Sequence, residues 1–210
     1  MRSLFLVFAL VVLLGSAATA SFDLAANFPA SQGQNGIWAQ AYNPSTSSFR
    51  DLEVITGGFG TPVQPLNMPY LKIFAEGIKA LPCWNGATYG TEWPAITYMA
   101  PQTGVYLIQG AFSNANDIGA TTRGLVFKNR LAATPLFAGN VTKTAPAVFD
   151  LKVSLLKGDC VRFAVDPLGN AEYDNTWLNG VVSTPEPGSL MAFATGLIGF
   201  AGLTRRRFRK

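Results

Sequence analysis

Short apolar runs separated by glycine and proline recur along most of the chain. Ten prolines between positions 44 and 167, with glycines among them, leave little room for long helices. The runs are short, several alternate between apolar and polar positions, and turn residues separate them at regular spacing. We therefore predict an all-β fold, a single antiparallel β-sandwich with jelly-roll-like topology. The predicted strands cover residues 36–42, 71–74, 95–99, 105–112, 124–128, 147–156, 160–165 and 178–182.

Two segments carry a turn between two alternating runs. Residues 96–112 contain the turn Pro101 to Gly104, and residues 149–165 contain the turn Lys157-Gly158-Asp159. A turn of this length between two strands is typical of a β-hairpin. We expect each segment to form a hairpin within one sheet.

The first 20 residues have the three parts of a secretory signal peptide. Arg2 supplies a positive start, residues 4–14 are apolar, and Ala18-Thr19-Ala20 supplies a small-residue cleavage site. The apolar run is shorter than the roughly 20 residues that span a bilayer. We predict that signal peptidase cuts after Ala20, with an uncleaved membrane anchor as the alternative.

Residues 185–210 form a second segment that is unlike the rest of the chain. Pro185, Glu186 and Pro187 come first, and residues 190–203 then contain no charge. At a rise of 1.5 Å per residue, these 14 positions make a helix of about 21 Å, a short transmembrane helix. A basic tail follows and resists translocation, so it is expected to stay in the cytoplasm. Its charged residues are Arg205, Arg206, Arg207, Arg209 and Lys210.

A Pro-Glu-Pro motif, a short apolar helix and an arginine-rich end, in this order behind a signal peptide, resemble the PEP-CTERM sorting signal. The resemblance implies processing by exosortase, a membrane-embedded cysteine protease. It also implies a Gram-negative bacterium that makes exopolysaccharide, and delivery to the cell surface, the extracellular matrix or a biofilm after a transient stay in the inner membrane. A plain C-terminal anchor with a chance motif is the alternative.

Residues 21–184 remain as one predicted domain. The chain has 16 Lys+Arg and 12 Asp+Glu; without Arg2, the five basic residues of the tail and Glu186, this domain keeps ten and eleven. Such a balance, with no basic cluster, argues against nucleic-acid binding. The chain has no histidine, which excludes a Ser-His-Asp triad, a Cys-His pair and histidine metal sites. No motif calls for a cofactor, and none is expected.

Aromatic residues are densest between positions 83 and 98. Aromatic rings stack on the C–H faces of sugars, and nearby polar groups bond to hydroxyls, so this stretch is a candidate glycan-binding site. Its candidate residues are Trp84, Tyr89, Glu92 and Trp93. Alternatively, these rings close the end of the core. Trp38 and Trp177 lie near predicted strand ends and are expected in the core.

Cys83 and Cys160 are the two cysteines of the chain. An exported protein meets an oxidising compartment, which favours a disulfide between them. Two buried free thiols are the alternative. A catalytic cysteine is disfavoured because no histidine is available to activate it.

The turn at residues 166–176 is rich in side-chain oxygen. Asp166, Asn170 and Asp174 offer the ligand type that calcium prefers, which makes them a weak candidate site. The spacing is not that of an EF-hand loop, and a turn rich in Asp and Asn is usually only a turn. No metal is therefore expected.

These features favour a non-catalytic protein, structural or adhesive, that contacts polysaccharide at the cell surface. The body also resembles the β-sandwich modules of bacterial extracellular proteins, including carbohydrate-binding modules. One alternative is a small secreted glycan hydrolase, which needs two carboxylates about 5–9.5 Å apart. Its loop candidates are Glu92, Asp117, Glu172 and Asp174. Another alternative is a surface subunit that binds other proteins through an exposed hydrophobic patch.

Overall fold

The computed structural model describes residues 20–46, 48–55, 58–60, 71–74, 79–82, 92–115, 121–129, 134–168 and 175–184. Residues Phe22–Ser183 form one compact unit, and the two chain ends form a second. The signal peptide, the C-terminal helix and the basic tail lie outside the described residues. In the part of the chain that is described, no helix is long and apolar enough to cross a membrane.

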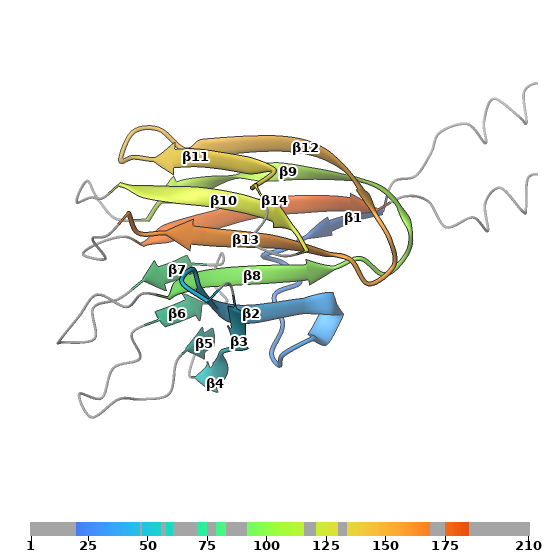
Figure 1. Ribbon diagram of the computed structural model, residues 1–210, viewed down its shortest axis with the longest axis horizontal. Coiled ribbons are helices and arrows are strands. Elements are labelled where there is room, and N and C mark those ends of the chain that lie inside the picture. Colours follow the sequence, from blue (N-terminus) through green and yellow to red (C-terminus); the bar gives the residue numbers. More distant parts are fainter. Residues whose placement is uncertain are drawn as a thin grey trace, which may run out of the picture. The chain divides into compact units, whose positions relative to one another are not determined.

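The compact unit is built almost entirely from strands (Figure 1). A 3-10 turn, η1, covers Gln34–Gly36. The strands are β1 (Ala20–Asp23), β2 (Ile37–Asn43), β3 (Ser48–Asp51), β4 (Glu53–Ile55), β5 (Gly58–Gly60), β6 (Leu71–Phe74), β7 (Lys79–Pro82), β8 (Trp93–Met99), β9 (Gly104–Asn114), β10 (Thr122–Lys128), β11 (Phe137–Val141), β12 (Ala147–Leu155), β13 (Cys160–Asp166) and β14 (Thr176–Thr184).

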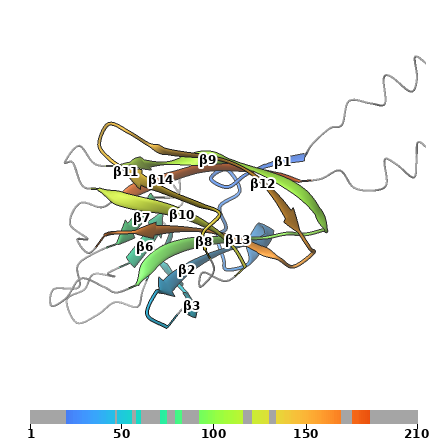
Figure 2. The same ribbon diagram turned by 45° about the horizontal axis from the view of Figure 1, so that its top comes forward.

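The strands form two antiparallel sheets. Within the described residues, one has eight strands in the order β12-β9-β14-β7-β6-β5-β4, with β1 paired to β14, and the other has six in the order β11-β10-β13-β8-β2-β3. Figure 1 shows β10, β13 and β8 side by side across the front. The turned view in Figure 2 follows β9 and β12 as neighbours in the other sheet. Strands β7 to β14 have the order of a jelly roll, which confirms the predicted fold class.

The core lies between the two sheets. Alternation along β12 buries Phe149, Val153 and Leu155, with Leu151 partly buried against the same core, and points the other residues outward. Phe149 of the eight-stranded sheet meets Phe163 of the six-stranded sheet, with ring centroids 5.8 Å apart. Burial of this apolar area from both sheets is the main force that holds the sandwich together.

A second contact between the sheets joins Tyr98 of β8 and Tyr106 of β9, with ring centroids 6.5 Å apart. Burial, and then the neighbouring Tyr106, raise the pKa of Tyr98 to about 12. The Tyr98 hydroxyl therefore stays protonated throughout the physiological range.

Both predicted hairpins are wrong. β8 pairs with β13 and β2, whereas β9 pairs with β12 and β14, so the turn after β8 carries the chain from one sheet to the other. The turn after β12 does the same, because β13 pairs with β8 and β10. A period of two shows that a strand has one buried face, but it does not show which sheet the strand joins.

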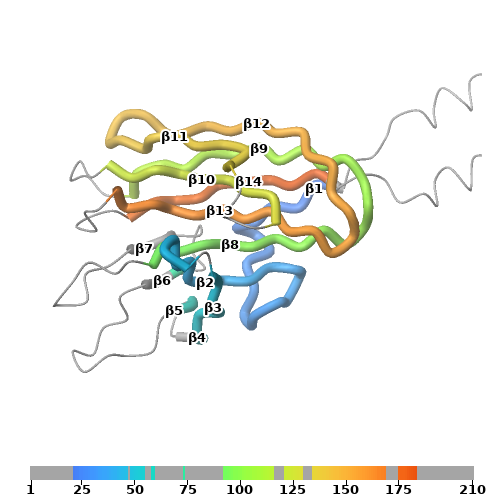
Figure 3. The backbone as a smooth tube through the Cα atoms, viewed as in Figure 1, coloured from blue at the N-terminus to red at the C-terminus, as the bar shows by residue number. Residues whose placement is uncertain are grey.

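The two crossings lie side by side at one end of the strands (Figure 3). The backbone N–H of Ala100 donates to the carbonyl of Asp159 at 2.8 Å, and the N–H of Gly158 donates back to Ala100 at 2.9 Å. The N–H of Lys157 also donates to Thr103 Oγ1 at 3.0 Å. Each crossing therefore supplies hydrogen-bond partners to the other.

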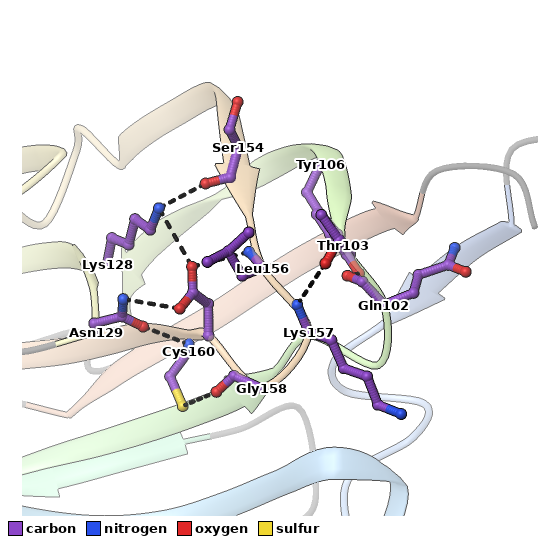
Figure 4. Close-up of polar contacts among 11 residues, drawn as sticks. Gln102, Thr103, Tyr106, Lys128, Asn129, Ser154, Leu156, Lys157, Gly158 and Cys160 are labelled. Carbon is purple, nitrogen blue, oxygen red and sulfur yellow. Dashed lines mark hydrogen bonds and ion pairs between the residues drawn. The ribbon is translucent and has the colours of Figure 1, made fainter.

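Asp159 ties this end together (Figure 4). Its carboxylate accepts hydrogen bonds from the N–H of Leu156 at 2.9 Å and from Asn129 Nδ2 at 3.1 Å, and it pairs with Lys128 Nζ at 3.3 Å. Asn129 has a left-handed backbone (φ 57°), and its Oδ1 accepts from the N–H of Cys160 at 2.8 Å. The network links both crossings to the end of β10.

Candidate functional site: the outer face of the six-stranded sheet

The six-stranded sheet carries apolar side chains on its outer face as well as on its inner face. Every residue from Pro94 to Tyr98 in β8 is buried, although alternate residues point away from the core. The outward residues belong to a second apolar cluster on that face. Its buried members are Tyr42, Ala95, Leu125, Phe127 and Ala164, with Phe49 and Trp93 partly buried against them.

Three rings form a continuous row on this outer face. Tyr42 of β2 lies opposite Trp93 in the sheet register and opposite Phe49 on its other side. The Tyr42 ring centroid is 5.4 Å from that of Trp93 and 5.0 Å from that of Phe49. Ala95 and Ala164 are paired in the same sheet, and their small side chains leave space for the larger rings to cover them.

Arg162 extends the row. It lies on β13, between Thr97 and Phe127 in the register, and its guanidinium carbon is 4.2 Å from the centroid of the Phe49 ring. This distance is that of a cation–π contact. The row Trp93–Tyr42–Phe49–Arg162, here called the aromatic–arginine row, combines partly exposed apolar surface with a positive group.

Polar groups border the row in fixed pairs. Arg50 Nη2 lies 2.6 Å from Glu92 Oε2, and Arg123 Nη2 lies 2.5 Å from Asp166 Oδ2. The Thr97 hydroxyl donates to Gln40 Oε1 at 2.7 Å. These contacts hold the side chains around the row in defined positions.

One more polar contact lies at the edge of the face. Gln40 Nε2 donates to Asp51 Oδ1 on the edge strand β3 at 2.8 Å. Because Thr97 donates to Gln40, this hydrogen bond continues a chain that crosses β8, β2 and β3.

Two of the four predicted glycan-binding residues belong to this face. Trp93 is in the row, and Glu92 pairs with Arg50 beside it. Trp84 and Tyr89 lie outside the described residues, so their part in a site stays a prediction.

Three contributors were missed by reading the sequence: Tyr42, Phe49 and Arg162. They lie far from the aromatic stretch along the chain, and only strand pairing brings them to it. The available signal was β8 itself, in which apolar residues run continuously as in a strand buried on both faces.

The expectation that Trp38 and Trp177 lie in the core is wrong. Trp38 is only partly buried, and it alternates with Ile37 and Ala39, which do face the core. It therefore points to the outer face of the six-stranded sheet. Trp177 is also partly buried and alternates with the core residue Leu178.

The described residues do not favour a metal site or an interior ligand site. Asp166 Oδ2 pairs with Arg123, and its Oδ1 accepts from the N–H of Leu168 at 2.9 Å. Within the described ranges, no three acidic or cysteine side chains gather as a metal would require. Asn170 and Asp174 lie outside them. A cavity of about 10 Å³ beside Ile96 and Phe112 has room for about one water molecule.

Cys160 carries a free thiol in the structure. Burial raises the pKa of this thiol, and its Sγ lies 3.8 Å from the carbonyl oxygen of Gly158 (Figure 4). A thiol with a raised pKa is a weak nucleophile at neutral pH. Cys83 lies outside the described residues, so the disulfide stays a prediction, which counting the thiols of unfolded, non-reduced protein decides.

The C-terminal segment matches a known family. Residues 183–207 match the family model of the PEP-CTERM protein-sorting motif. The resemblance predicted from the sequence is therefore confirmed. The motif defines a class of exported proteins that exosortase processes. Its presence implies an exported protein that is anchored transiently in a membrane and then placed at the cell surface.

No curated protein sequence matches the chain. Among solved structures, the cleaved K3 adhesin domain of Lys-gingipain from Porphyromonas gingivalis is similar at 15% identity and a TM-score of 0.40, covering 79% of this chain and 97% of that one. A family 35 carbohydrate-binding module from Clostridium thermocellum is similar at 18% identity and a TM-score of 0.28, covering 49% and 86%. Bushbaby GITRL is similar at 16% identity and a TM-score of 0.28, covering 71% and 96%. Likenesses this distant carry no argument about function.

Proposed function

We propose that the protein is a non-catalytic component of the cell surface or extracellular matrix that contacts polysaccharide through the aromatic–arginine row. The aromatic–arginine row is the observation that supports this proposal. It offers partly exposed rings for the apolar faces of sugars, and polar groups in fixed positions beside them. Sorting to the cell surface by the PEP-CTERM motif would bring this face to the polysaccharide of the producing cell.

The rigidity of the row supports a binding role. Tyr42 lies against both Trp93 and Phe49, so none of the three rings moves without disturbing another. Because the rings are ordered before a ligand arrives, binding costs less conformational entropy.

The test uses the full-length chain in mild detergent and the exopolysaccharide of the producing organism. Trp93→Ala should weaken binding at least about tenfold, since stacked aromatic residues dominate such surfaces. Trp177→Ala is the matched control, because Trp177 is a partly buried tryptophan of the other sheet. Equal affinities of all three proteins, each with an unchanged circular dichroism spectrum, would reject the proposal.

The hydrolase alternative has one described candidate, Glu92, and it is already paired with Arg50. Reducing-sugar release by the purified chain tests this alternative directly. Turnover that is abolished by Glu92→Gln would replace the binding proposal with a catalytic one.

A protein-binding surface is the second candidate function. On the eight-stranded sheet, Val105, Leu107 and Val148 are 46%, 39% and 66% exposed, and all three lie on the two neighbouring strands β9 and β12. Val105 and Leu107 are successive outward residues of β9, whereas Val148 lies farther along the sheet, opposite Ala111. Exposed apolar side chains that are neighbours are typical of interaction sites. Leu107→Lys should abolish capture of a surface partner without affecting polysaccharide binding.

A further inference from the structure

Arg162 differs from the other arginines on the outer face. Arg50 and Arg123 each pair with a carboxylate, Glu92 and Asp166 respectively. Among the described residues, Arg162 makes no hydrogen bond or ion pair, and its contact is with the Phe49 ring. Its Nε is buried without a hydrogen-bond partner, as is that of Arg123, but Arg123 has Asp166 to compensate its charge.

The unpaired state of Arg162 needs an explanation. A buried N–H group without a partner costs free energy, and a charged group costs more than a neutral one. Burial also lowers the pKa of the Arg162 guanidinium, the direction expected when a positive charge is desolvated. An anion from outside the chain would compensate this charge.

The described carboxylates near Arg162 already have other donors. Asp166 pairs with Arg123, Asp51 accepts from Gln40, and Asp159 accepts from Asn129 and from the N–H of Leu156. None of them is shown bonding to Arg162. Within the described residues, therefore, no carboxylate is bonded to Arg162, and an anionic group of a ligand could take that role.

Phe49 positions the guanidinium group of Arg162. The ring lies against one side of the guanidinium group and limits the positions that the group can take. A guanidinium group held in this way presents its N–H donors as a fork, which fits the two oxygens of a carboxylate. The remaining rings of the row are on the same face, where a sugar bearing that carboxylate would lie.

We infer that Arg162 binds the carboxylate of a uronic-acid unit, so that the aromatic–arginine row selects acidic over neutral polysaccharide. This inference rests on the proposed function, because it names the class of polysaccharide that the same face takes.

The experiment compares polygalacturonate with the same polymer after its carboxylates have been reduced to alcohols. The full-length chain, in detergent and at physiological ionic strength, should bind the acidic form about tenfold more tightly or better, as a charge-assisted fork would give. Arg162→Gln should bring this ratio close to one. Lys152→Gln is the matched control, since it removes one exposed positive charge from β12 in the other sheet and should keep the ratio.

Two further variants keep the test informative if Arg162→Gln does not fold. Arg162→Lys keeps the charge but not the fork, so the ratio should fall without reaching one. Phe49→Leu keeps an apolar side chain but removes the ring under the guanidinium, and should also lower the ratio.

The outcomes separate this inference from the proposed function. Equal binding of both polymers, unaffected by Arg162→Gln, would overturn the inference and leave polysaccharide contact standing. Binding of neither polymer, together with no binding of the native exopolysaccharide, would overturn both. If Lys152→Gln lowered the ratio of affinities as much as Arg162→Gln does, net charge would explain the preference, and the inference would be overturned. Arg162-dependent binding of dextran sulfate but not of polygalacturonate would overturn the choice of a carboxylate.

Discussion

At the scale of single residues, Asp159 stabilises the turns that carry the chain from one sheet to the other. Its carboxylate bonds to the turn that contains it, through Leu156, and to the end of β10, through Lys128 and the following residue Asn129. These contacts lower the pKa of Asp159, with the backbone hydrogen bond from Leu156 as the largest cause. The ionised form is therefore the one that stabilises the fold.

Asp159→Ala should lower the Tm at neutral pH by about 2–4 °C, since it removes hydrogen bonds to a charged acceptor. The folded-state pKa is lowered, so the stabilisation is complete above the ordinary value of 3.8 and is lost as pH falls through the folded-state value. The difference between the two proteins should therefore persist at neutral pH and vanish well below pH 3.8. Thermal unfolding followed by circular dichroism measures it.

Asp150→Ala is the control for that experiment. Asp150 is an exposed acid on the outward side of β12, and its substitution removes the same charge. The Tm of the Asp150→Ala variant should equal that of the unchanged protein at every pH. An equal effect of both substitutions would show that net charge is responsible, and not the network around Asp159.

At the scale of strands, the close approach of β9 and β14 depends on glycine. Gly110 and Gly180 face each other in the register. A Cβ atom at Gly110 would lie 2.7 Å from the Phe149 ring and 2.8 Å from the Cα of Gly180, and it would also overlap the carbonyl oxygen of Asn179. Most of these neighbours are backbone, which cannot move aside without disturbing the pairing.

Gly110→Ala should therefore destabilise the protein by about 3 kcal/mol, the upper part of the usual range for an overpacked interior. Gly180→Ala is the matched change on the partner strand, where the new Cβ would lie 3.0 Å from the flexible end of Leu24 and make ordinary contacts of 3.8 Å with Gln109 and Phe149. Urea unfolding should give a smaller loss for Gly180→Ala. Equal losses would contradict this account of the pairing.

Strand positions were predictable because the signal is local. The runs at 105–112 and 147–156 fall within one or two residues of β9 and β12. Strand partners were not predictable. Tyr98 and Tyr106 would face the core if the turn between them formed a hairpin in one sheet, and they also face it when the turn carries the chain to the other sheet. The polar strand β3 (Ser48–Asp51) carried no pattern, so Phe49 could not be placed on the outer face.

At the scale of the whole molecule, the sorting motif and the proposed binding face are separate parts of the chain. The family match covers residues 183–207, whereas the aromatic–arginine row lies between Tyr42 and Arg162. Changes in one part should therefore leave the other intact.

Replacing Pro185, Glu186 and Pro187 with alanine should leave an unprocessed precursor in the membrane fraction. Immunoblots of membrane and medium measure the distribution. The precursor should still bind polysaccharide as the normal protein does. Asn179→Ala, at an exposed position of β14 before the matched segment, is the control and should be processed normally. Release of the triple variant at the normal rate would count against recognition of these three residues by exosortase.

β14 leads directly into the sorting motif, and this has a mechanical consequence. It pairs with β9 from Thr176 to Ser183, and with β7 and β1 as well. A pull on the C-terminal end, while that end is held in the membrane, would load β14 along its length. Its hydrogen bonds to β9 would then have to shear together, which resists force better than opening them one at a time. The strand beside the anchor is thus placed to withstand drag on a surface protein.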